Sequence, residues 1–277
     1  MTSPLNSSWI PHALDLVESV AGSTALDVLE TATDDRLVCL GMSAPLAVLS
    51  YLTPHPVATF ALASFALWYG TRVYDYSSAK RQLIEKKLEQ IAAASSGPAK
   101  ALIIQSAQDE MGALSMRTHV EKVRELAKTH KIERVVVHNG REFLAALKPG
   151  QFDIVWLRAH GHPDRIEIGS GFELAKHTER SLLQSLANKV KHGGKLILEC
   201  CSAGGGEKSI ADHIGTFCWE RTVYAPITKI SGILGFEFDR WGYPQFNDGF
   251  LRKGKNVTRV IDGPEPRRFL SLYAPRA

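Results

Sequence analysis

The chain has 277 residues, of which 44% are hydrophobic and 22% are charged, as is typical of a globular protein with a sizeable core. Its net charge of +4 is spread over 33 basic and 29 acidic residues, and no basic run alternates with aromatic residues. We therefore expect no nucleic acid among its partners. The adjacent cysteines Cys200 and Cys201 are poorly suited to two separate disulfides, which favours reduced thiols and a cytosolic setting.

The N-terminal third predicts a membrane attachment. Residues 1–36 lack the basic start and apolar core of a cleavable secretory signal. Residues 37–74 then hold two apolar lobes separated by "TPHP", and no Asp, Glu, Lys or Arg occurs between Arg36 and Arg72. Each lobe is somewhat shorter than the roughly 20 residues of a comfortable membrane span, so we expect a tight helical hairpin or a shallow re-entrant insertion rather than two full spans. Basic residues on both sides place both ends on the cytoplasmic side. A pair of buried soluble helices is the alternative.

Residues 75–97 are interpreted as a helical linker, because "SAKRQLIEKKLEQIAAA" is amphipathic and "SSGP" ends it. From residue 98 to residue 277 strand patterns alternate with helix patterns. This order predicts an α/β domain with a mainly parallel sheet that is covered on both faces. The expected strands are 101–107, 133–139, 152–160, 195–201 and 222–227, and the expected helices are 119–130, 141–147, 173–192 and 207–220.

Two of these strands end in residues that can take part in catalysis. One delivers His160 and Gly161, and the next strand along the chain delivers Cys201 before a glycine-rich loop. In an open α/β sheet the working crevice lies beyond the carboxyl ends of the strands. A right-handed crossover makes the two strands parallel and adjacent, about 4.8 Å apart. We therefore expect His160 and Cys201 to face each other.

This pair is suited to acyl transfer. A thiol attacks as its thiolate, which a neighbouring imidazole and the N-terminus of the helix expected near Glu207 would both favour. The backbone N–H groups of Gly161 and Cys201 are placed to stabilise the developing oxyanion. A side chain at residue 161 would obstruct that approach. Glycines in "SAGGG" allow the chain to turn sharply after the cysteine.

The stretches "IVWLRAHG" and "LILECCSAGG" resemble the caspase-like cysteine peptidases of clan CD, which include caspases, metacaspases, legumains and CHAT-domain proteins. The resemblance covers roughly residues 99 to 227, and it implies a three-layer caspase-like fold. It also implies that His160 is the general base and acid, Gly161 the oxyanion-hole glycine and Cys201 the nucleophile. No third member of a triad is evident.

The same resemblance assigns Glu199, two residues before the nucleophile, to the pocket for the residue that precedes the cleaved bond. Side chains two apart on a strand share a face, so its carboxylate can reach the crevice of Cys201. A carboxylate there predicts cleavage after a basic residue, with asparagine possible. Asp109, in the turn after the first strand, is a second candidate for this pocket. A helix N-cap is the alternative role for Asp109.

Other interpretations compete with this one. His162 is expected to be a solvated loop residue, and a metal site formed by His160, His162 and a cysteine lacks a second ligand pair, so we expect no metal and no cofactor. A non-catalytic caspase-like scaffold at a membrane is the alternative function. The preferred hypothesis is a membrane-tethered cysteine endopeptidase that acts on a protein or peptide substrate and faces a reducing cytosol. Its oligomeric state is left open.

Overall fold

A computed structural model of the chain describes residues 81–108, 114, 117–148, 150–230, 236–240, 242–247 and 256–264. The chain divides into two compact units, Met1–Lys86 and Lys87–Ala277. The predicted hairpin at residues 37–74 lies outside the described residues, whereas the linker helix is present at residues 81–94. Among the helices that the structure describes, none combines the length and apolar character needed to cross a membrane.

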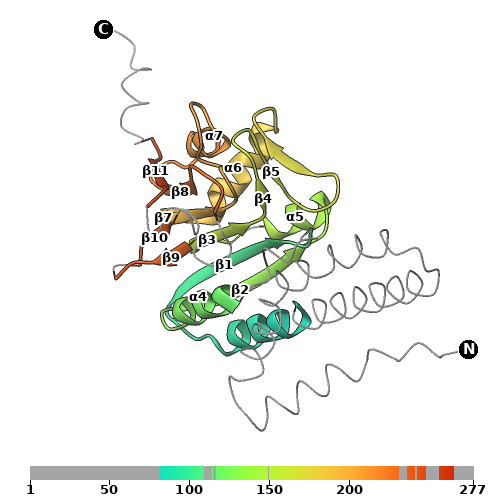
Figure 1. The fold of residues 1–277 in the computed structure, drawn as a ribbon, viewed down its shortest axis with the longest axis vertical. Coiled ribbons are helices and arrows are strands. Elements are labelled where there is room, and N and C mark those ends of the chain that lie inside the picture. The colour runs from blue at the N-terminus through green and yellow to red at the C-terminus, as the bar shows by residue number, and fades with distance from the viewer. Residues whose placement is uncertain are drawn as a thin grey trace, which may run out of the picture. The chain divides into compact units, whose positions relative to one another are not determined.

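The second unit is built on a six-stranded sheet with the strand order β11-β8-β7-β3-β1-β2 (Figure 1). Neighbouring strands from β2 to β8 are parallel, and only β11 runs antiparallel to its neighbour β8. The strands are β1 (Ala99–Ser106), β2 (His130–Val137), β3 (Phe152–Arg158), β7 (Val190–Glu199), β8 (Thr222–Pro226) and β11 (Thr258–Asp262). The predicted α/β class with a mainly parallel sheet is confirmed.

Both faces of the sheet are covered. Trp156 and Leu157 are consecutive on β3 and face opposite sides, yet both are fully buried. On one face, side chains of α5, α6 and α7 form the main core with β3 and β7. On the other face lie α4 and the pair formed by β9 (Phe236–Phe238) and β10 (Pro244–Phe246), where Phe236 packs edge-on against Trp156 at 5.0 Å between ring centroids. The arrangement is compatible with three layers. The helices are α4 (Arg117–Ala127), α5 (Gly140–Ala146), α6 (Arg180–Lys189) and α7 (Ile210–Gly215).

The structure differs from the sequence prediction between β3 and α6. The expected strand 152–160 ends at Arg158, and His160 begins a separate small sheet of β4 (His160–Gly161), β5 (Arg165–Glu167) and β6 (Glu173–Ala175). The helix expected at 173–192 is therefore shorter at both ends. Its first residues form β6, where Leu174 pairs with Ile166 and both are buried. A strand of three residues is too short to show an alternation that could be recognised in the sequence.

The far edge of the sheet is not formed by the strands that directly follow β8 in the chain. β9 (Phe236–Phe238) and β10 (Pro244–Phe246) pair with each other instead of joining the six-stranded sheet. The edge is completed by β11, from the pair Thr258 and Pro226 to the pair Asp262 and Thr222. None of the five residues of β11 is buried, so this edge strand lacks the apolar run of the central strands.

Candidate active site

The register of β3 and β7 determines how far along the two strands the predicted dyad residues lie. Arg158 and Glu199 are the last pair of these parallel strands, and the N–H of Ala159 donates to the carbonyl oxygen of Glu199 at 3.4 Å. His160 and Cys201 each follow two residues beyond that pair. Adjacent parallel strands are about 4.8 Å apart, so equal advances bring the two residues to one rim of the sheet.

Gly161 provides independent evidence of this proximity. A Cβ placed on Gly161 would lie 2.7 Å from the Cβ of Cys200 and 2.9 Å from the carbonyl oxygen of Cys201. The backbone of β4 therefore packs directly against the Cys200–Cys201 peptide, with no room for a side chain. This contact joins the residues after β3 to the residues after β7 where both strands end.

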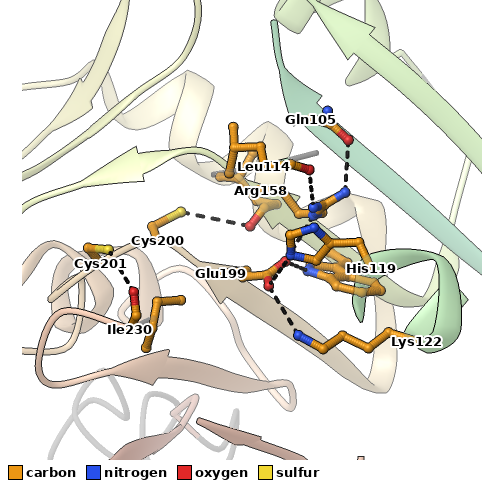
Figure 2. Close-up of polar contacts among 11 residues, drawn as sticks. Gln105, Leu114, His119, Lys122, Arg158, Glu199, Cys200, Cys201 and Ile230 are labelled. Atoms are coloured by element: carbon orange, nitrogen blue, oxygen red, sulfur yellow. Dashed lines mark hydrogen bonds and ion pairs between the residues drawn. The ribbon is translucent and has the colours of Figure 1, made fainter. Parts of the chain in front are cut away.

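The two cysteines face different surroundings (Figure 2). Cys200 is fully buried in the main core, and its Sγ lies 3.7 Å from the carbonyl oxygen of Leu157. This burial raises the pKa of the Cys200 thiol well above its usual value. Cys201 is partly exposed, and its Sγ lies 3.8 Å from the carbonyl oxygen of Ile230, in the chain after β8. Of the two thiols, only that of Cys201 is accessible to a substrate.

The helix that follows Cys201 differs from the sequence prediction. The following helix, α7, begins at Ile210 rather than near Glu207, and its first amides donate to acceptors other than the sulfur of Cys201. A capping box between Ser209 and Asp212 closes the N-terminus of this helix. The remaining amides have other acceptors: Ile210 N–H donates to Pro163 O at 2.7 Å, and Ala211 N–H donates to Ala203 O at 3.1 Å. The prediction that the first amides of this helix point toward the sulfur of Cys201 was therefore wrong.

The structure places Glu199 on the sheet face that α4 covers, with 5% of its surface exposed. Both of its carboxylate oxygens already have donors (Figure 2): Oε1 lies 3.0 Å from Nε2 of His119 and 3.6 Å from Nζ of Lys122, while Oε2 lies 3.0 Å from Nε1 of Trp156 and 2.9 Å from Nε of Arg158. The carboxylate is therefore bound inside the protein and is not presented to solvent beside Cys201.

We call Glu199, His119, Lys122, Trp156 and Arg158 the Glu199 cluster. Burial alone would raise the pKa of the Glu199 carboxyl, but the interaction with His119 and the positive charges of Lys122 and Arg158 outweigh it and hold this pKa well below its usual value. Burial lowers the pKa of His119 to about 4, so its imidazole is neutral at pH 7 and donates one hydrogen bond to Glu199.

The remaining predicted residues lie elsewhere. Asp109 is outside the described residues. The side chain of His162 is 49% exposed, with its Nε2 3.4 Å from Oε1 of Glu167. Within the part of the chain that the structure describes, no three His, Cys, Asp or Glu side chains gather as a metal site.

Sequence reasoning missed Arg158 and His119 as parts of this region. An arginine inside the apolar run "IVWLR" was the available signal, because a buried charge needs a partner. Nothing in the sequence marked His119, which begins the buried face of α4.

Comparison with known proteins adds no family: no protein-family model matches the chain, and no curated protein matches it.

Proposed function

We propose that the chain is a cysteine endopeptidase with a caspase-like three-layer domain, in which His160 and Cys201 form the catalytic dyad. The observation that carries this proposal is the packing of Gly161 against the Cys200–Cys201 peptide, at the rim where β3 and β7 end in register. A histidine and an accessible cysteine at the carboxyl ends of adjacent parallel strands are suited to nucleophilic catalysis.

The mechanism follows from these roles. His160 takes the proton of Cys201, and Sγ attacks the peptide carbonyl to form a C–S bond. The N–H groups of Gly161 and Cys201 stabilise the oxyanion. His160 then protonates the leaving amine as the C–N bond breaks, and water hydrolyses the thioester with His160 again as base.

Specificity for a basic residue or asparagine stays a prediction. Recognition of a basic residue by Glu199 requires an available carboxylate, and this carboxylate is already bound by Arg158 and Lys122. Cleavage of a peptide library in which the residue before the cut is varied will measure the preference directly. The membrane tether at residues 37–74, with the domain facing a reducing cytosol, also remains part of the proposal.

Selective labelling of one thiol tests the proposal. An acyloxymethyl-ketone peptide at neutral pH is expected to label Cys201 of the full-length chain, as mapped by peptide mass spectrometry. Cys200 and Cys218 should stay unlabelled, because both are fully buried and burial raises the pKa of Cys218 to about 12. Labelling should be lost in His160→Ala. Equal labelling of wild type and His160→Ala would instead indicate the non-catalytic scaffold.

A second prediction concerns the close approach of Gly161. Gly161→Ala should lower kcat/KM by about 100-fold, because the added methyl group displaces the backbone that carries the oxyanion donors. Gly171→Ala is the matched control. At Gly171 the φ of +68° is strained for alanine, but no atom lies within 4 Å, so a cost of about 1 kcal/mol in stability with unchanged kcat/KM is expected. Full activity of Gly161→Ala would show that the contact is not needed.

A further inference from the structure

Arg158 and Glu199 lie directly beneath the candidate dyad. Each precedes its dyad residue by two positions, Arg158 on β3 and Glu199 on β7, and the two are paired in the sheet register. Nε of Arg158 is 2.9 Å from Oε2 of Glu199, and the two side chains are 0% and 5% exposed. This ion pair therefore bridges the strand ends that carry His160 and Cys201.

The other contacts of Arg158 extend the bridge. Its Nη1 donates to Oε1 of Gln105 on β1 at 2.8 Å, and its Nη2 donates to the carbonyl oxygen of Leu114, in the chain between β1 and α4. Glu199 in turn accepts from His119 on α4. One guanidinium thus ties the carboxyl ends of three adjacent strands to one another and to the chain that leads into α4 (Figure 2).

This arrangement is costly if it serves stability alone. Two buried charges lose their hydration, and apolar side chains of the same size are often at least as stabilising. What an ion pair with several fixed hydrogen bonds adds is a defined geometry. Substrate binding by Glu199 has little support, because both of its oxygens are already held by protein donors.

We propose that Arg158 and Glu199 are positioning residues, which fix the register and separation of the β3 and β7 ends so that His160 and Cys201 keep their reacting geometry. This inference rests on the proposed peptidase function. It replaces the substrate-binding role that the sequence suggested for Glu199.

Steady-state kinetics of the full-length chain on a peptide selected from the library test the proposal. Glu199→Gln keeps the size of the side chain, and Arg158→Lys keeps the charge but loses the planar set of donors. In both variants we expect kcat to fall by about 10- to 100-fold, with KM within about 2-fold of wild type. The rate at which iodoacetamide alkylates Cys201 should fall as well. Each variant is assayed below its own unfolding temperature, so that unfolded protein does not lower the measured kcat.

The matched control is a second ion pair between the same strands. Lys191 on β7 and Asp153 on β3 join them near their amino ends, with Nζ 3.0 Å from Oδ1. Asp153→Asn breaks this pair far from the dyad along the strands, and kcat should be unchanged.

Two results would overturn the positioning role. Wild-type kcat in Glu199→Gln and Arg158→Lys shows that the bridge is not needed. A higher KM confined to peptides with Arg or Lys before the cut, with kcat kept, shows that Glu199 binds substrate. The proposed function fails in a different way, because the wild-type chain would then cleave no library peptide and show no His160-dependent labelling of Cys201. The inference would fall with it.

Discussion

Replacing Cys201 by alanine is expected to lower kcat/KM by about four to six orders of magnitude, because it removes the proposed nucleophile and with it the covalent route. The neighbouring Cys200→Ala should leave kcat/KM within about 10-fold of wild type. Cys200 packs in the core, and its raised pKa keeps the thiol protonated. Hydrolysis of the selected peptide by the full-length chain, with circular dichroism to verify folding, measures both effects.

The adjacent pair makes this comparison informative. Cys200→Ala removes one buried sulfur and should lower the free energy of unfolding by about 1 kcal/mol, whereas Cys201→Ala should change stability less because Cys201 is partly exposed. Cys201→Ala is therefore expected to have the larger effect on kcat/KM, and Cys200→Ala the larger effect on the free energy of unfolding. Loss of turnover in Cys200→Ala with turnover kept in Cys201→Ala would reverse the assignment of the nucleophile.

The positions of His160 and Cys201 were predictable because they depend on apolar patterns within single strands and on the right-handed crossover between parallel strands. Apolar runs marked β3 and β7, and the handedness of the crossover made them neighbours. The structure adds the register, in which Arg158 pairs with Glu199. Because of that register, both residues of the candidate dyad lie two positions beyond the last pair.

The surroundings of Glu199 were not predictable in the same way. Alternation along β7 indicated which residues share a face with Glu199, but not what covers that face. His119 and Lys122 come from α4, about 80 positions earlier in the chain, and contacts at that separation leave no mark in a single sequence. A carboxylate that was expected to bind substrate is consequently found in an internal ion pair.

Lowering the pH from 7 to 4 is expected to reduce the free energy of unfolding by about 3 kcal/mol through His119. Burial lowers the pKa of His119 from 6.5 to about 4 in the folded chain. The unfolded chain therefore takes up the proton first as the pH falls. The stability associated with neutral His119 is fully present above pH 6.5, and it is lost as the pH falls from 6.5 towards 4. Urea unfolding at a series of pH values measures this slope.

His119→Gln separates this effect from the rest of the Glu199 cluster. The glutamine amide can still donate to Glu199, but it does not titrate, so the slope between pH 6.5 and 4.5 should flatten. Below pH 4.5 the variant should still lose stability. The cationic neighbours of Glu199 hold its pKa well below the usual value of 4.5, so the stability that its charge contributes is lost as the pH falls from 4.5 towards this lowered pKa.

The matched control is His130→Gln. Burial also lowers the pKa of His130, but this side chain is partly exposed and contacts Thr129 rather than Glu199, so its removal should flatten the slope less. An unchanged slope in His119→Gln would mean that the imidazole of His119 is not a neutral hydrogen-bond donor in the folded chain. Glu199 would then be held by Arg158, Lys122 and Trp156 without it. A flattened slope would show that the acid sensitivity of the fold depends on His119, on the sheet face that also holds Arg158 and Glu199 beneath the candidate dyad.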